Sequence, residues 1–311
     1  MRICQSIEET VGGTPLVRLA RLERYLGLHA ELVAKVESAN PAGSAKDRVA
    51  VSMINAAERA GRLREGGVII EPTSGNTGLG LAMVAAVRGY RAIIVMPDSM
   101  SEERRRLMRA YGAELVLTDG ALGMRGAIAR AEQMAREIPG SYLPSQFENP
   151  ANAEAHLTGT GPELWRDTDG QLDVFVAGVG TGGTLTGVGE YLRQKKPDVR
   201  LIAVEPKGSP VLSGGSAGAH GLQGIGAGFV PAVLNTAIYD EVITVSEEDA
   251  YRFVRLLGRR EGILAGISSG AALCAAVEVA SRPESAGLRI AVLLPDTGER
   301  YLSTSVFAEE Q

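Results

Sequence analysis

The sequence has few cysteine, histidine and aromatic residues. Among its 311 residues there are two cysteines and three histidines, and aromatic side chains make up 5%. Cys4 and Cys274 are too few for a disulfide framework and show no metal-ligand spacing. The histidines at 29, 156 and 220 are scattered along the chain, which argues against a zinc site. These shortages exclude a disulfide-stapled domain and make a metalloenzyme a poor hypothesis.

Long apolar runs and basic clusters are missing as well. No run reaches the roughly 18 apolar residues of a membrane-spanning helix, and the first residues do not resemble a secretory leader. The net charge is −5, and no stripe of lysine and arginine suggests binding to nucleic acid. We therefore expect a cytoplasmic protein that binds small molecules and neither nucleic acid nor a membrane.

Short apolar runs alternate with helical patterns along most of the chain, and the alternation occurs in two series. The first series has expected strands at 68–71, 92–96 and 114–117, with expected helices at 79–88, 101–111 and 126–137. The second has expected strands at 173–177, 201–205, 241–245 and 290–294, with expected helices at 246–260 and 269–280. Continuous apolar runs between helices are typical of buried parallel strands.

The two series predict an α/β protein of two domains. Further strands are expected at 14–19 and 30–36. The segment 140–160 is rich in Pro, Asn and Ser, so we expect irregular structure and a domain boundary there. The segment 207–230 is rich in glycine and lacks periodicity, and a loop of that length is usually functional.

A lysine is expected in the first turn of a helix within the stretch Asn40–Arg48. Pro41 and Gly43 favour a tight turn, Ser44 is a good N-cap, and apolar residues then recur at helical spacing. The positive end of the helix dipole repels the ammonium of Lys46, which favours loss of its proton. A neutral amine can condense with a carbonyl, whereas the alternative interpretation is a solvated lysine beside a turn.

Two loops rich in glycine and hydroxyl groups precede expected helices and could contact a ligand. Thr73–Gly78 places hydroxyls, an amide and backbone N–H groups at a helix N-terminus, which suits an anion, although an ordinary capped turn is the alternative. Gly266–Ala272 opens a helix of small residues. That loop is either a close packing surface or a ligand site, and Ser268 is its better ligand candidate.

A third loop, Gly178–Thr184, follows an expected strand and could close its backbone amides on a phosphate. It also satisfies the spacing G-x-G-x-x-G, and Glu205 ends the next strand where a dinucleotide-binding fold places its ribose-binding acid. A nicotinamide-dependent dehydrogenase is therefore the rival hypothesis. That hypothesis leaves the lysine stretch and the loop Thr73–Gly78 without a role.

Taken together, these motifs resemble those of the cysteine synthase (O-acetylserine sulfhydrylase) family, pyridoxal-phosphate enzymes of fold type II that perform β-replacement. The matching segments are 13–16, 40–48, 73–78, 178–187, 224–231, 261–272 and 298–304. Ala265 stands where a thiosulfate-accepting type carries a cysteine, so the chain resembles the sulfide-using type. The resemblance implies a tryptophan synthase β-like fold, with two α/β domains and the cofactor in the cleft between them. The expected domains are residues 39–148, and residues 1–38 plus 149–311.

The resemblance also implies a role for individual residues. Lys46 is the lysine that forms a Schiff base with the cofactor and moves the substrate's α-proton. Ser268 pairs with the pyridine nitrogen, and Asn76 contacts the cofactor's 3′-oxygen. The expected phosphate cradle consists of Gly180, Thr181, Gly182, Gly183 and Thr184. The expected substrate-binding residues are Thr73, Ser74, Asn76, Thr77 and Gln146, with Gly224 facing the leaving acyl group.

The implied reaction replaces the acetate of O-acetyl-L-serine with sulfide to give L-cysteine through an aminoacrylate intermediate. The resemblance further implies a homodimer and possible docking of a serine acetyltransferase. Related pyridoxal-phosphate lyases, such as cystathionine β-synthase or a serine/threonine dehydratase, remain open because they use the same cofactor-binding parts.

Overall fold

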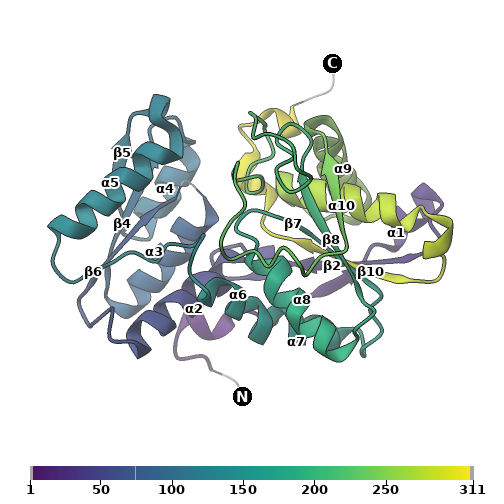
Figure 1. The fold of residues 1–311 in the computed structure, drawn as a ribbon, viewed down its shortest axis with the longest axis horizontal. Helices are drawn as coiled ribbons and strands as arrows, with labels where there is room; N and C mark the ends of the chain where they lie inside the picture. Colours follow the sequence, from purple (N-terminus) through teal and green to yellow (C-terminus); the bar gives the residue numbers. More distant parts are fainter. Residues whose placement is uncertain (1–2, 74, 309–311) are drawn as a thin grey trace. The chain divides into compact units, whose positions relative to one another are not determined.

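The computed structural model describes residues 3–73 and 75–308. The described chain divides into two compact units (Figure 1). The first unit comprises residues up to Val11 together with Asn40–Asn152. The second comprises Gly12–Ala39 together with the residues from Ala153 onward. Each unit is an α/β structure, as the two series of strands and helices predicted.

A four-stranded parallel sheet forms the centre of the first unit. Its strands lie in the order β5-β4-β3-β6. They span Val68–Pro72 (β3), Arg91–Pro97 (β4), Glu114–Thr118 (β5) and Ser141–Tyr142 (β6). Ile69 and Ile70 are neighbours in β3 and are both fully buried. Since successive side chains of a strand point to opposite faces, both faces of this sheet are covered.

Helices pack around this sheet and against one another, and two of them begin at candidate residues. They are α2 (Lys46–Arg59), α3 (Asn76–Arg88), α4 (Glu102–Ala110) and α5 (Gly123–Glu137). Ala127 and Ala131 of α5 pack on the side chains of β3 and β4. Helix α3 contacts β4 and also packs against α2. A Cβ at Gly80 would lie 2.9 Å from the carbonyl oxygen of Lys46, so a glycine permits this close approach.

A six-stranded sheet forms the centre of the second unit, in the order β1-β2-β10-β7-β8-β9. The edge strand β1 is antiparallel to β2, and the other neighbours are parallel. The strands span Leu16–Arg18 (β1), Glu31–Val36 (β2), Val174–Gly178 (β7), Arg200–Pro206 (β8), Glu241–Val245 (β9) and Arg289–Leu294 (β10).

Helices cover both faces of the six-stranded sheet. They span Ala20–Leu26 (α1), Ala151–Ala155 (α6, which begins at the end of the first unit), Gly161–Asp167 (α7), Gly183–Lys195 (α8), Glu247–Glu261 (α9) and Ile267–Ala280 (α10). Side chains of α9 and α10 share one core with Val176 and Val292. Side chains of α7 and α8 share the other with Phe175 and Leu293. The sheet therefore lies between two helical layers, as parallel sheets require.

The expectation of irregular structure over 140–160 is wrong for its second half. Helix α6 continues through a π-helical turn, η4 (His156–Thr160), into α7. Pro162 lies in the first turn of α7, where its missing N–H costs little. By contrast, residues 207–240 contain no helix or strand among the described residues, so the long aperiodic loop is confirmed.

Short 3-10 turns complete the described secondary structure. They span Ile7–Thr10 (η1), Glu37–Ala39 (η2), Gly120–Leu122 (η3), Pro283–Ser285 (η5), Gly298–Tyr301 (η6) and Ser305–Phe307 (η7).

Candidate active site

Lys46 is the first residue of α2, as the sequence predicted. The N-cap position is Ala45 rather than Ser44, but the Ser44 hydroxyl still accepts the Lys46 backbone N–H at 3.2 Å. The buried carboxylate of Asp47 accepts the Ala42 N–H at 2.6 Å and a longer hydrogen bond from the Ser44 hydroxyl at 3.3 Å. These bonds fasten the turn before α2, so the backbone that carries Lys46 is fixed.

The loop from Thr73 to Gly78 joins β3 to the N-terminus of α3. Gly75 is the N-cap, and its N–H donates to the Thr73 hydroxyl at 3.3 Å. Asn76 is the first residue of α3, and the Thr77 hydroxyl donates to Oε1 of Gln146 at 2.6 Å. Thr77 and Gln146, which are 69 positions apart in the chain, are therefore direct neighbours. Ser74, also expected here, lies outside the described residues.

A buried acid, which the sequence analysis missed, holds Gln146 in place. Glu71 of β3 accepts the N–H of Ser145 at 2.9 Å and the N–H of Gln146 at 3.2 Å. Burial raises the pKa of Glu71 to about 7, although the two backbone N–H groups act in the opposite direction. The sequence signal was a single acidic residue directly after the apolar run 68–70 and two positions before the candidate loop.

In the second unit, the glycine-rich loop after β7 leads into the N-terminus of α8. Gly182 is the N-cap and has φ +83°, which few other residues adopt. A Cβ at Gly180 would collide with the carbonyl oxygen of Gly224, and one at Gly182 would collide with Leu234. The Thr181 hydroxyl accepts the Gly183 N–H at 3.4 Å. Backbone N–H groups at such a helix start bind phosphate well.

Thr184 has a buried neighbour that sequence reasoning also missed. Its hydroxyl lies 3.2 Å from Nε2 of His156, whose Nδ1 lies 2.9 Å from the hydroxyl of Thr160. If Nε2 carries the ring proton, it donates to Thr184, which keeps its own hydroxyl hydrogen for an anion. His156 begins the π-helical turn, so no regular helical spacing linked it to the loop after β7.

Ser268 and Gly224 lie next to one another in the second unit. Ser268 is the second residue of α10 and is 3% exposed. Gly224 has φ +95°, and a Cβ there would lie 3.5 Å from the Ser268 hydroxyl oxygen. The carbonyl oxygen of Gly224 lies so close to Gly180 that it leaves no room for a Cβ there. The structure thus brings together the candidate residues of three segments: the loop after β7, the long loop and α10.

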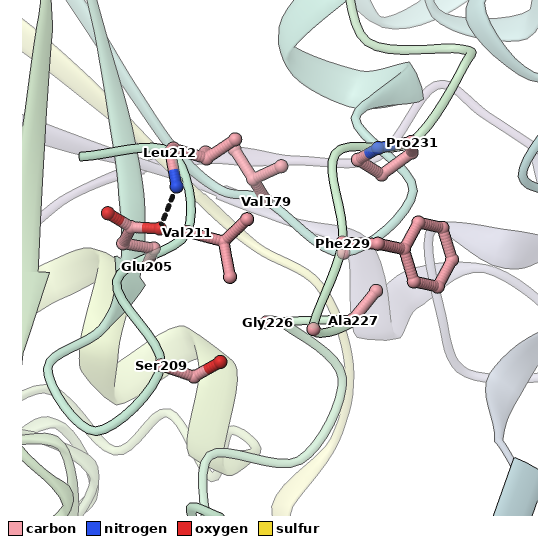
Figure 2. Close-up of a pocket in the computed structure, with 11 residues that line it drawn as sticks. Val179, Glu205, Ser209, Val211, Leu212, Gly226, Ala227, Phe229 and Pro231 are labelled. Carbon is pink, nitrogen blue, oxygen red and sulfur yellow. Dashed lines mark hydrogen bonds between the residues drawn. The ribbon is translucent and has the colours of Figure 1, made fainter. Parts of the chain in front are cut away.

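Glu205 does not serve as a ribose-binding acid in this arrangement. Its carboxylate accepts the N–H of Leu212 at 2.7 Å, and the N–H and hydroxyl of Ser213 at 2.9 and 2.6 Å. Figure 2 shows the carboxylate directed at the Leu212 N–H, beside a pocket that Val179 and Phe229 also line. Both carboxylate oxygens are therefore used to hold the start of the long loop, which removes the main support for the dinucleotide hypothesis.

The described residues contain neither a cluster of metal-binding side chains nor a helix that could span a membrane. In residues 3–73 and 75–308, no group of three or more His, Cys, Asp or Glu side chains could hold a metal ion. Over the same residues, no helix is long and apolar enough to cross a membrane.

Comparison with known proteins gives consistent matches along almost the whole chain. A cysteine synthase of Staphylococcus aureus strain Mu50 is 51% identical over 304 residues, which cover 97% of each chain. A crystal structure of cysteine synthase from Entamoeba histolytica superposes with a TM-score of 0.96 at 45% identity, covering 100% of this chain and 93% of that one. An O-ureido-L-serine synthase structure gives 0.95 at 46% identity, covering 100% and 98%.

The family comparison names a cofactor. Residues 7–296 match the family described as pyridoxal-phosphate dependent enzymes. This match replaces the dehydrogenase hypothesis, and the glycine-lined loop after β7 suits the phosphate of that cofactor. The chain therefore belongs to the family of pyridoxal-phosphate-dependent enzymes.

Proposed function

We propose that this protein is a cysteine synthase, which replaces the acetate of O-acetyl-L-serine with sulfide and releases L-cysteine. The observation that carries the proposal is the 51% identity to a cysteine synthase over 97% of both chains. The family match over residues 7–296 includes every loop that the sequence analysis singled out. Such extensive similarity supports a shared reaction more strongly than a shared fold alone would.

The residues of the second unit fit pyridoxal 5′-phosphate. We assign the phosphate to the backbone N–H groups and hydroxyls of Gly180–Thr184, because a side chain at Gly180 or Gly182 would collide with its surroundings. We assign the pyridine nitrogen to the buried hydroxyl of Ser268. When bound, this cofactor withdraws electrons from the substrate's α-carbon. The neutral Ser268 hydroxyl orients the ring and adds no charge.

The residues of the first unit are assigned to the amino-acid substrate and to proton transfer. Lys46 holds the cofactor through its side-chain amine and moves the α-proton once that amine is released. Asn76 contacts the cofactor's 3′-oxygen. The substrate carboxylate binds at the N-terminus of α3, where helix N–H groups favour an anion. The carboxylate-binding residues are Thr73, Ser74, Thr77 and Gln146, with Asn76 alongside, and Gly224 of the second unit faces the leaving acetate.

An assay of the purified holoenzyme tests the reaction. With O-acetyl-L-serine and sulfide, we expect stoichiometric release of cysteine and acetate. Parallel reactions contain serine with homocysteine, serine or threonine alone, and O-acetyl-L-serine with hydroxyurea. Turnover of serine with homocysteine that is faster than the sulfide reaction would indicate a cystathionine β-synthase. Release of a keto acid from serine or threonine alone would indicate a dehydratase. Turnover with hydroxyurea that is faster than with sulfide would indicate an O-ureido-L-serine synthase.

We also propose a cytoplasmic homodimer that docks the C-terminal tail of a serine acetyltransferase, on the strength of the family resemblance. The same resemblance supports the assignment of the cofactor to the cleft between domains 39–148 and 1–38 plus 149–311. Light scattering reports the mass of the particle in solution, and titration with the acetyltransferase tail peptide reports docking. A monomeric particle would contradict the homodimer. A tail peptide that leaves activity unchanged would contradict docking of the acetyltransferase.

A further inference from the structure

We propose that Glu71 is a positioning residue for substrate binding, whose buried carboxylate fixes Gln146 and, through it, the hydroxyl of Thr77. The inference rests on the proposed function, because it assigns the amide NH₂ group of Gln146 to the substrate carboxylate. Glu71 itself lies behind the loop and acts through the backbone of residues 145–146.

The carboxylate of Glu71 bridges two successive backbone N–H groups. One oxygen accepts from Ser145 at 2.9 Å and the other accepts from Gln146 at 3.2 Å. Ser145 has φ +56°, a conformation that a serine adopts only at a cost. The two bonds therefore hold a backbone turn that the sequence would not adopt unaided, and this turn presents Gln146.

Gln146 is restrained at three points once this turn is in place. Its N–H donates to Glu71, its backbone carbonyl accepts from Nδ2 of Asn152 at 2.8 Å, and its side-chain oxygen accepts from Thr77 at 2.6 Å. The side-chain oxygen is thus already used. The amide NH₂ group of Gln146 is the part that can donate to a substrate carboxylate.

The two backbone N–H groups need a partner at position 71 that offers two acceptor oxygens, although burying an acid there is unfavourable. Glu71 is 1% exposed, and no cation forms an ion pair with it in the described part of the chain. A buried carboxylate without a cation is unfavourable, and burial accordingly raises the pKa of Glu71 to about 7. Yet a carboxylate is the group that offers two acceptor oxygens to two N–H groups. A glutamine would direct its NH₂ group at one of them.

The first experiment compares Glu71→Gln with the unmodified holoenzyme, well above pH 7, where Glu71 is ionised. We expect the KM for O-acetyl-L-serine to rise about tenfold, as for one impaired hydrogen bond to a charged ligand. The KM for sulfide and the visible absorption of the bound cofactor should not change. Glu23→Gln is a control for the loss of a buried acid elsewhere. Glu23 accepts the N–H of Leu32 at 2.8 Å in the second unit, and unlike Glu71 it also forms an ion pair with Arg18 at 2.9 Å.

A double-mutant cycle then separates positioning from general destabilisation. If Glu71 acts through Gln146, adding Glu71→Gln to Gln146→Ala should not raise KM further. Additive effects, or an unchanged KM in Glu71→Gln, would overturn the inference while leaving the proposed function intact. Failure of the unmodified protein to turn over O-acetyl-L-serine would overturn the proposed function and the inference with it. If Glu71→Gln does not fold, Glu71→Asp, which retracts the charge, should raise KM in the same way, and an unchanged value would refute the inference.

Discussion

Replacement of Glu71 by glutamine should change how the stability of the protein depends on pH. In the folded protein, burial raises the pKa of Glu71 from 4.5 to about 7. The folded state therefore binds this proton more tightly than the unfolded chain does. The protonated acid therefore contributes to the free energy of unfolding. This contribution is fully present below pH 4.5 and is lost as the pH rises through about 7. Glutamine does not titrate, so the variant escapes this loss.

The size of the effect follows from the shift in pKa. A rise from 4.5 to about 7 corresponds to about 3 kcal/mol of unfolding free energy. The free energy of unfolding of Glu71→Gln, relative to the unmodified protein, should therefore increase by about 3 kcal/mol from below pH 4.5 to above pH 7. The amide also faces one backbone N–H with its own NH₂ group, which lowers the variant's stability by an amount that does not vary with pH.

Denaturant unfolding of both proteins in matched buffers measures this difference. Every other titrating group, and the bound cofactor, is common to the two proteins and cancels in the subtraction. The difference curve should rise through the range between pH 4.5 and pH 7 and level off outside it. Parallel curves would show that Glu71 titrates as it does in the unfolded chain. A falling curve would mean that the two N–H bonds outweigh burial.

Three further predictions concern other parts of the molecule. Lys46→Ala should remain folded and lose turnover, and borohydride reduction of the unmodified holoenzyme with peptide mapping should label Lys46 and no other lysine. Thr181→Ala and Thr184→Ala should each weaken cofactor retention on dialysis by roughly 1.5–3 kcal/mol, and full retention in the double variant would contradict the phosphate assignment. Burial raises the pKa of Cys274 to about 12, so a thiol reagent should modify it only after unfolding, and rapid modification of the native protein would contradict this.

The strand and helix pattern was predictable because each central strand is locally recognisable. The runs 68–71 and 290–294 became β3 and β10, and both are buried on both faces, which makes them apolar throughout. The order of the strands in the sheet could not be predicted in the same way. Strand β10 lies between β2 and β7, and β2 precedes it by more than 250 residues, so no local period reports that pairing.

The helical stretch from Ala151 to Asp167 was missed because its local signals conflict with its packing. Pro150, Gly159, Gly161 and Pro162 all favour breaks in a helix. The structure tolerates them by widening one turn into a π-helix and by placing Pro162 at the start of α7. Tertiary packing against α8 compensates for this poor propensity, since a Cβ at Gly187 would collide with the Ala153 carbonyl.

Among the candidate site residues, the loops were predictable and their buried supports were not. Composition marked Thr73–Gly78 and Gly178–Thr184, because hydroxyls and glycines before a helix have few other uses. His156 and Glu71 touch the site through contacts across 28 and 75 positions of the chain. The lone acid after the apolar run 68–70 marks Glu71 as unusual, but no local pattern in a single sequence indicates which distant residues either side chain contacts.

The proposed anion sites of the two units are built in the same way. In each, the candidate anion-binding groups are hydroxyls and backbone N–H groups at the start of a helix, at α3 in one and at α8 in the other. Neutral donors attract a carboxylate or a phosphate and, unlike a lysine or an arginine, do not form an ion pair with an acid of the protein instead.

A neutral group is also the proposed partner of the cofactor's pyridine nitrogen. In the site we propose, the hydroxyl of Ser268 faces this nitrogen, and a hydroxyl would not stabilise a protonated ring as an aspartate would, so the cofactor would be a modest electron sink. That suits a reaction in which a leaving acetate takes the electrons promptly, and it disfavours transamination, which needs a long-lived carbanion. Glu71 fits this proposal, because its two oxygens accept the backbone N–H groups of residues 145 and 146. Only the neutral amide of Gln146 would then face the ligand.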